Sequence, residues 1–234
     1  MCSTELRLEI LSRVPFFADL SAGDVAEINR LFRENGHTPG ETIFHAGDPA
    51  TRLYVVADGK VKLMRHTLGG QGVLLDILTL GEFFGSLATL GDAEYADTAQ
   101  AQTACCVLGI AAQDFQTVLH RYPPVALKVL ETVSARLKSA HETIRQLSAL
   151  PVESRIASAL LTLAHKVGEP QGKAVLIQMP LSRQDLAAMT GATHETVSRV
   201  MSQLKKDGVI RTGRQWVAIA DSERLSEIAA SEIG

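Results

Sequence analysis

The sequence predicts an α+β protein in three parts: an N-terminal antiparallel β-roll of the jelly-roll kind, one long helix, and a C-terminal domain that ends in two short helices and a hairpin. Three observations predict this order. Short runs of β-forming residues separated by glycines fill residues 38–110, a helical stretch then runs without interruption to Pro151, and the last third alternates amphipathic helices with short strands. The expected boundaries in the 234-residue chain are 1–120, 121–150 and 151–234.

Five runs of β-forming residues predict the strands of the roll. They are short, nearly regularly spaced and separated by glycines, which is typical of an antiparallel sandwich or jelly-roll barrel whose interior often holds a small ligand. A structural barrel without a ligand is the alternative. Before the roll, Ser21 with Asp24 three residues later predicts the start of a helix over 22–33. The five runs are 41–44, 53–56, 60–64, 73–77 and 104–108.

A long helix is predicted between Pro123-Pro124 and Pro151, because proline is tolerated in the first turn of a helix and breaks a helix further along. Apolar residues on this helix step by three and four positions, which is the spacing of a two-stranded coiled coil. The stripe packs either on the roll of its own chain or on the same stripe of a second copy. Its members are Leu130, Val133, Leu137, Ala140, Ile144 and Leu147.

The C-terminal domain begins with an amphipathic helix over 153–167, followed by a loop over 168–172 and a strand over 175–177. Ser182, with Asp185 three residues later, forms a capping-box pattern that places a short helix at 183–190. Gly191 then marks a turn before a second helix. Residues 209–219 predict a hairpin that turns near Gly213. Two helices joined by a glycine turn and followed by a hairpin form a winged helix-turn-helix.

The second of these two helices has one apolar and one polar face. Its apolar residues fall at i, i+3, i+4 and i+7, whereas four polar residues project from the opposite side. A helix-turn-helix places its second helix in the DNA major groove, where residues near the N-terminus of that helix reach the base edges. We therefore expect double-stranded DNA as a partner, and a palindromic site favours a homodimer over packing of the long helix on its own roll. The apolar set is Val197, Val200, Met201 and Leu204, and the polar set is Glu195, Ser198, Arg199 and Ser202.

The net charge of −3 is unevenly distributed along the chain. Residues 1–150 hold 13 basic and 17 acidic side chains, whereas residues 151–234 hold 10 and 9. Within 182–216 the counts are 6 and 3, so the basic surplus falls on the predicted helix-turn-helix and hairpin. This is the electrostatic pattern that contact with DNA phosphates requires.

Composition predicts a cytoplasmic protein without a membrane span or an enzymatic site. No apolar run approaches the roughly 18 residues of a membrane helix, and the first residues lack the apolar core of a signal peptide. No phosphate-binding glycine loop, metal-spaced cluster or nucleophile elbow occurs in the sequence. Three cysteines are too few for an iron-sulfur cluster, so Cys2, Cys105 and Cys106 are expected as reduced thiols. In a strand, Cys105 and Cys106 face opposite ways with one of them buried, and a vicinal redox pair is the alternative.

Six short motifs follow one another along the chain, four in the roll and two in the helix-turn-helix. They are Gly47-Asp48, Leu53–Val56, Gly59–Val61, Gly81–Gly85, Ser182–Leu186 and Glu195–Arg199. Together with the order of roll, long helix and winged helix-turn-helix, they resemble the CRP/FNR family of bacterial transcription regulators over nearly the whole chain. The resemblance implies a cyclic-nucleotide-binding-like roll, a homodimeric regulator that senses a small effector, and RNA polymerase as a further partner.

In the family that the chain resembles, the counterparts of Arg183 and Gln184 contact the phosphate backbone, and those of Glu195, Ser198 and Arg199 face the bases. The chemistry agrees with these roles, because arginine can donate two hydrogen bonds to guanine and glutamate can accept one from cytosine. The Glu-x-x-Ser-Arg arrangement looks like the FNR branch of the family. That branch implies TTGAT-like half-sites in an inverted repeat.

Thr193 and His194 stand at the start of the second helix and complete the expected set of DNA contacts. His194 either contacts a base or a phosphate, or it fills the helix start. For Arg199 the alternative is a solvated charge on an exposed helix face. A rival hypothesis makes the chain a signalling module whose roll acts through protein partners, and it predicts no salt-dependent affinity for DNA.

The expected effector pocket departs from the cyclic-AMP pattern of the same family. In that pattern an acidic residue follows the barrel glycine and an Arg-Ser pair grips the cyclic phosphate, whereas this chain has Ser86 and the pair Tyr95-Ala96. Without a carboxylate or a guanidinium, cyclic AMP would lose its charge-assisted hydrogen bonds, so cyclic AMP is not expected. On the long helix, Ala140 and His141 replace the two hydroxyl residues that meet the nucleotide. The expected pocket is Gly85, Ser86, Tyr95, Ala96, Ala140 and His141.

His141 makes haem the candidate cofactor, because a histidine can ligate haem iron or titrate near neutral pH. The run 95–101 resembles the dissimilatory nitrate respiration regulators of the family, which supports sensing of nitric oxide through haem. A polar flank beside the dimer seam is the alternative role for His141, and the effector stays unidentified. Weaker ligand candidates are His37, His45, His66 and Cys2.

Overall fold

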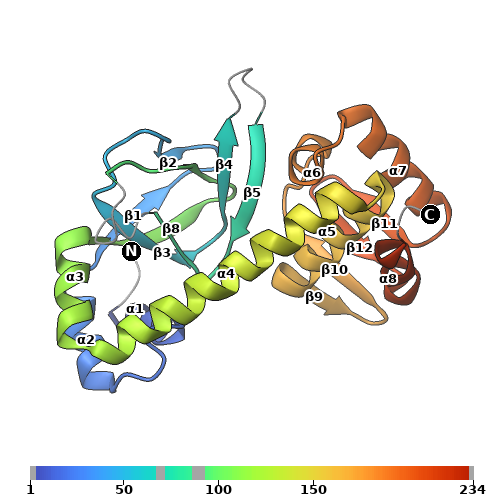
Figure 1. Ribbon diagram of the computed structural model, residues 1–234. Coiled ribbons are helices and arrows are strands. Elements are labelled where there is room, and N and C mark those ends of the chain that lie inside the picture. Colours follow the sequence, from blue (N-terminus) through green and yellow to red (C-terminus); the bar gives the residue numbers. More distant parts are fainter. Residues whose placement is uncertain (1–3, 67–71, 86–92, 232–234) are drawn as a thin grey trace. The chain divides into compact units, whose positions relative to one another are not determined.

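The computed structural model describes residues 4–66, 72–85 and 93–231 (Figure 1). The chain folds into two compact units, one of residues 1–71 and 75–138 and one of residues 72–74 and 139–234. The first unit is an antiparallel β-roll with helices, and the second is a helical domain with a small sheet. The predicted α+β class is therefore confirmed. Helix α4, Pro123–Ala149, is the predicted long helix, and none of the helices in the described ranges is long and apolar enough to cross a membrane.

Two four-stranded sheets form the roll within the described residues, with the strand orders β1-β8-β3-β6 and β2-β7-β4-β5. Strands far apart in sequence pair antiparallel, as β3 does with β8 and β2 with β7. Each of the five predicted runs overlaps a strand, whereas β1, β6 and β7 have no predicted counterpart. The strands are β1 (Arg33–His37), β2 (Thr42–Phe44), β3 (Arg52–Asp58), β4 (Val61–His66), β5 (Gly72–Leu78), β6 (Phe83–Gly85), β7 (Thr98–Ala101) and β8 (Cys105–Ala111).

Helix α2 is shorter than predicted. It begins at Ala22 behind Ser21, whose side chain accepts a hydrogen bond from the backbone N–H of Asp24 at 3.1 Å, but it ends at Asn29 rather than at residue 33. Arg33 instead opens β1, where antiparallel pairing with β8 gives the backbone its hydrogen-bond partners. The other helices of the first unit besides α4 are α1 (Thr4–Arg13) and α3 (Ala112–Arg121).

Among the described residues of the first unit, one apolar cluster lies on each side of the sheet that contains β3. In the cluster beneath the helices, the rings of Phe16 and Phe83 meet edge-on with centroids 4.9 Å apart. The other cluster fills the inside of the roll and includes Phe44 and Phe84. Neighbouring strand residues point to opposite faces, so Phe83 and Phe84 belong to different clusters.

The second unit has the predicted winged helix-turn-helix fold. Its four strands have the order β11-β12-β10-β9. Ile177, Val217 and Ile219 on one face of this sheet are buried, as are Ile156 and Leu160 of α5. The elements are α5 (Val152–Val167), β9 (Gly168–Gln171), β10 (Ala174–Gln178), α6 (Arg183–Thr190), α7 (His194–Lys206), β11 (Ile210–Gly213), β12 (Trp216–Ile219) and α8 (Ser222–Ala230).

The loop predicted over 168–172 is mostly strand β9, so that prediction was wrong. β9 is an edge strand that pairs with β10. Pro170 is tolerated there, because one side of an edge strand needs no partner for its backbone N–H groups. A Cβ at Gly168 would overlap the carbonyl oxygen of Ala164 in α5, so this glycine permits the close approach of helix and strand.

Candidate nucleic-acid interface

Helix α6 is held at both ends by the residues that the sequence singled out. The Ser182 hydroxyl accepts a hydrogen bond from the Asp185 N–H at 3.0 Å, and the Asp185 carboxylate accepts one from the Ser182 N–H at 2.9 Å. This reciprocal pair is the predicted capping box. At the other end Gly191 adopts a left-handed conformation, with φ 59° and ψ 35°, which favours glycine. The turn between α6 and α7 is thereby defined by local chemistry.

Helix α7 buries one face and exposes the other. Val197, Met201 and Leu204 are buried on the inner face, while Val200 is half-buried. Three residues of the opposite set are exposed and one is half-buried, so the predicted division of the two faces is confirmed. The exposed residues are Glu195, Arg199 and Ser202, and the half-buried one is Ser198.

The first turn of α7 carries three of the expected contacts. The Thr193 hydroxyl accepts a hydrogen bond from the Thr196 N–H at 3.2 Å, so Thr193 is the N-cap of the helix, and His194 is exposed beside it. The pKa of Glu195 lies below its usual value, first because of a hydrogen bond from its own backbone N–H and then because of one from the Thr193 hydroxyl. Glu195 is therefore an ionised hydrogen-bond acceptor at neutral pH.

Arg183 and Gln184 occupy the first turn of α6. Arg183 is half-buried, and this burial lowers the pKa of its guanidinium, while Gln184 is exposed. The free N–H groups and the dipole of a helix N-terminus favour an anion. A guanidinium and an amide at this position suit a DNA phosphate.

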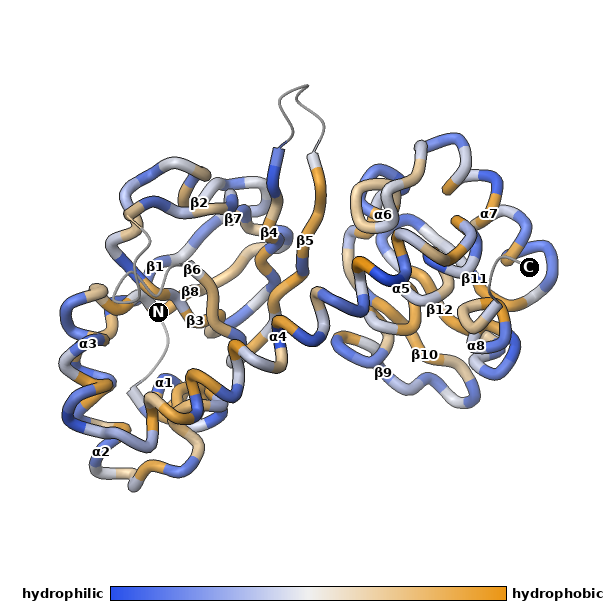
Figure 2. Tube along the Cα trace, in the orientation of Figure 1, coloured by the Kyte–Doolittle hydropathy of each residue, from blue (hydrophilic) through white to orange (hydrophobic). Residues whose placement is uncertain are grey.

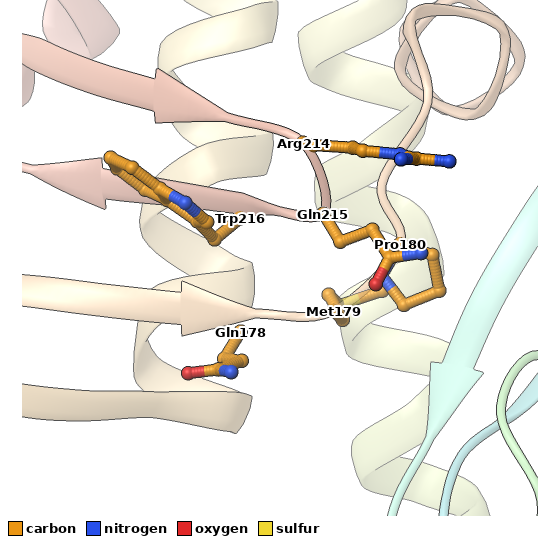
Figure 3. A pocket seen from close by; sticks show the side chains of 6 residues that line it. All are labelled: Gln178, Met179, Pro180, Arg214, Gln215 and Trp216. Carbon is orange, nitrogen blue, oxygen red and sulfur yellow. The ribbon is translucent and has the colours of Figure 1, made fainter.

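A groove beside the hairpin was not predicted from the sequence. It has a volume of about 480 Å³ and lies between the hairpin turn and the segment that leads into α6 (Figure 3). The indole of Trp216 covers Gly213, because a Cβ on that glycine would overlap the ring. Gln215 at the turn has a φ of 119°, which is rare for a residue other than glycine. The groove is lined by Gln178, Met179, Pro180, Arg214, Gln215 and Trp216.

The apolar stripe of α4 is exposed in the single chain. Its five large side chains have exposed fractions of 40–66%. Hydrophobic segments recur along α4 between polar ones (Figure 2). Arg136 is the neighbour of Leu137 and contacts the roll instead. Its guanidinium carbon lies 3.9 Å from the centroid of the Phe83 ring, and its Nη2 donates a hydrogen bond to the Phe83 carbonyl oxygen at 2.6 Å. The exposed members of the stripe are Leu130, Val133, Leu137, Ala140, Ile144 and Leu147.

Two of the expected effector-pocket residues lie together in the roll. Gly85 has a φ of +92°, and a Cβ on it would lie 2.8 Å from the carbonyl oxygen of Arg52 and 3.5 Å from the Tyr95 ring. The Tyr95 hydroxyl donates to that carbonyl at 3.0 Å and accepts from the Arg52 N–H at 3.1 Å. Its ring stacks on Phe44 with centroids 3.8 Å apart. Tyr95 is thus a buried, fully bonded part of the roll interior.

The other expected pocket residues are at the surface or outside the described residues. Ala96 is exposed in the roll, and Ala140 and His141 are exposed on α4. Ser86 lies outside the described residues.

The cysteines and the remaining histidines form no cluster within the described part of the chain. Cys105 is buried and Cys106 is half-buried, as expected for neighbours in a strand, and neither is in a disulfide. Burial raises the pKa of the Cys105 thiol to about 11. His37 contacts Glu41 at 2.9 Å, whereas His45 and His66 are exposed. Among the described residues, which exclude Cys2, no three histidine, cysteine or acidic side chains are grouped to hold a metal ion.

The roll and the C-terminal domain each match a known protein-family model. Residues 37–122 match the cyclic nucleotide-binding domain, and residues 154–228 match the Crp-like helix-turn-helix domain. The cyclic AMP receptor protein of Thermus thermophilus is 34% identical over 215 residues, which cover 92% of this chain and 96% of that protein. The chain belongs to the CRP/FNR family. It is a DNA-binding transcription regulator with an effector-binding domain.

Further members of the CRP/FNR family agree in sequence and in fold. A CRP-like cAMP-activated global transcriptional regulator of Mycobacterium tuberculosis is 28% identical over 221 residues, 94% of this chain and 99% of that protein. The crystal structure of a CRP/FNR-family transcriptional regulator from Thermus thermophilus covers 86% of this chain and 100% of its own, with a TM-score of 0.72 and 26% identity. FixK2 from Bradyrhizobium japonicum, at 22% identity, shares the fold with a TM-score of 0.76 over 86% of this chain and 98% of its own.

Proposed function

We propose that this CRP/FNR-family regulator acts as a homodimer whose two α7 helices read the two halves of an inverted DNA repeat. The observation that carries the proposal is the division of α7 into a buried apolar face and an exposed polar face that begins at a capped N-terminus. Such a helix is fixed in the fold by one side and free to enter the major groove with the other. The regulator works with RNA polymerase and has no catalytic role of its own.

Sequence is read by the first two turns of α7. Arg199 donates two hydrogen bonds to guanine, the ionised Glu195 accepts from cytosine N4, and Ser198 serves either kind of partner. The Glu-x-x-Ser-Arg pattern supports a TTGAT-like half-site. Phosphate contacts come from the starts of both helices, where four residues lie at or beside a helix N-terminus. They are Arg183, Gln184, Thr193 and His194.

The α4 stripe supplies the twofold contact. Five large apolar side chains on one helix face are left in water in the single chain, and each fully buried leucine or isoleucine is worth about 1.5–3 kcal/mol. The same stripe of a second copy, at coiled-coil spacing, is the surface that fits it.

The signal is a small effector other than cyclic AMP. Tyr95 stands where the cyclic-AMP pattern has an arginine, so position 95 supplies no guanidinium to a cyclic phosphate. The Tyr95 hydroxyl is instead bonded to the Arg52 backbone, and its ring stacks on Phe44. Haem is the candidate cofactor, because the exposed His141 imidazole on α4 could ligate its iron. Bound haem would supply the binding of nitric oxide, and the neighbouring thiols of Cys105 and Cys106 are the alternative redox group. An absorption spectrum after haem addition tests this part: a stoichiometric shifted Soret band supports haem, and an unshifted spectrum rules it out.

A gel-shift titration tests the DNA function. The probes are a TTGAT inverted repeat, the same half-sites as a direct repeat, and a scrambled duplex, each over a series of salt concentrations. The proposal predicts tightest binding to the inverted repeat, with an affinity that falls as salt rises. The rival signalling module, in which the roll acts through protein partners, predicts no salt-dependent DNA affinity for any probe.

A further inference from the structure

Three elements of the second unit meet around Gly191, at the turn between α6 and α7. Nη1 of Arg155, in the first turn of α5, donates a hydrogen bond to the carbonyl oxygen of Thr190 at 2.5 Å. A Cβ on Gly191 would lie 3.3 Å from the same Nη1 and 3.4 Å from a methyl carbon of Leu147, near the end of α4. We call Leu147, Arg155, Thr190 and Gly191 the turn clasp.

The clasp places a cation where α6 is most negative. The last carbonyl groups of a helix have no partner within the helix and carry the negative end of its dipole. A guanidinium on the Thr190 carbonyl forms a charge-assisted hydrogen bond, which is stronger than a neutral one. Nε of Arg155 is buried without a hydrogen-bond partner among the described residues. The arginine therefore keeps Nη1 on this carbonyl at the cost of one unmade hydrogen bond.

Leu147 connects the clasp to the apolar stripe of α4. It is a member of the stripe and is 44% exposed, and its side chain lies beside Gly191, where it would touch an added Cβ. A second copy that packs on Leu147 therefore packs on a side chain that lies beside the turn before α7.

We propose that Arg155 is a positioning residue for DNA recognition: it fixes α6 and α7 against the last turns of α4, and Leu147 transmits the packing of the dimer seam to that joint. The inference rests on the proposed function for its consequence on DNA. Arg155 lies on α5 and spends Nη1 on the Thr190 carbonyl, so the proposal assigns its effect to the separation of the two α7 helices rather than to the contacts that each one makes.

The first test measures the distance between α4 and α7 in the absence of DNA. Two spin labels are placed on the full-length chain, at Glu142 on α4 and at Gln203 on α7, both exposed. Cys2 and Cys106 are replaced by serine, and Cys105 stays because it is buried. Distances are measured by pulsed electron-electron double resonance. Labelled protein is diluted into unlabelled protein, so that a dimer rarely holds two labelled chains and only distances within one chain are measured.

Arg155→Met should shift or broaden the distance distribution, and Leu147→Ala should do so in the same direction. Arg155→Lys keeps a donor for the Thr190 carbonyl and should stay near the parent distribution. Arg224→Met is the matched control, because Arg224 is exposed and pairs with Glu227 on α8. A parent-like distribution for Arg155→Met in a folded chain overturns the proposal, as does an equal change in the Arg224→Met control.

The second test reads the consequence on DNA. Inverted repeats are made with the half-site spacing changed by one base pair in either direction, and a single half-site is included. The parent should prefer one spacing, and Arg155→Met should reduce that preference roughly five- to tenfold while its affinity for the single half-site stays the same. A merely structural role would lower both affinities together and leave the preferred spacing unchanged. If the parent binds no repeat but Arg155→Met still changes the distance between the two labels, the proposed DNA function is refuted while the role of Arg155 in positioning α6 and α7 is supported.

Discussion

Truncation of Leu137 on α4 should weaken dimerisation without weakening the single chain. Leu137 exposes 57% of its side chain, and full burial of a leucine is worth about 1.5–3 kcal/mol, so covering the exposed part is worth about 1–1.5 kcal/mol per chain. A symmetric dimer contains the contact twice, which gives about 2–3 kcal/mol. Because about 1.4 kcal/mol is a tenfold change in Kd, Leu137→Ala should raise the dimer Kd roughly thirty- to a hundredfold.

Sedimentation velocity over a wide range of protein concentrations measures this Kd. Leu75→Ala is the matched control, because Leu75 has a similar exposed fraction of 47% but lies on β5 rather than on the stripe. Thermal unfolding of the dilute Leu137→Ala chain should match that of the parent, since little is buried there before association. An unchanged Kd for Leu137→Ala, or an equal rise for Leu75→Ala, would refute the assignment of the seam.

Three further predictions concern the groove, α7 and the thiols. Gly213→Ala should displace the Trp216 indole, which its Cβ would overlap, and so shift the emission of this single tryptophan to longer wavelength; unchanged emission would contradict the close contact. The carboxyl of Glu195 should titrate below 4.5 by NMR, because its charged form accepts hydrogen bonds, so the helix stabilisation that it provides persists above that pH and is lost as the pH falls through the lowered pKa. In the native chain a thiol reagent at about pH 8 should modify Cys106 faster than Cys105, whose pKa is raised to about 11, and equal rates would show that Cys105 is accessible.

The elements that sequence predicts well are those with local signals. The two proline boundaries bracket α4, and the capping box starting at Ser182 and the glycine turn at Gly191 give the bounds of α6 as observed. The buried face of α7 follows from its spacing alone. These features depend on residues within one or two helical turns, so neighbours in sequence are enough to predict them.

The strands that sequence misses have a local composition that does not indicate a strand. β1 carries the polar run Arg33–His37 and becomes a strand because β8, about seventy residues later, pairs with it. β9 contains glycine and proline, which usually indicate a loop, yet it forms the edge of a sheet. In the site, the bond between Tyr95 and Arg52 joins residues 43 positions apart, and the groove beside Trp216 is lined by two separate segments of the chain. The residue types were visible, but their surroundings were not.

The central claim is that α7 reads base sequence. The most direct test is the effect of Arg199→Ala on the specificity ratio, which is the affinity for the TTGAT inverted repeat divided by the affinity for a scrambled duplex. Binding to the TTGAT inverted repeat and to a scrambled duplex is measured at one salt concentration for the parent, Arg199→Ala and the control Arg224→Ala. Loss of a bidentate contact to guanine costs about 1–3 kcal/mol at each half-site. The ratio should collapse for Arg199→Ala, with weak salt-sensitive binding retained, and stay at the parent value for Arg224→Ala. An unchanged ratio for Arg199→Ala would contradict the claim.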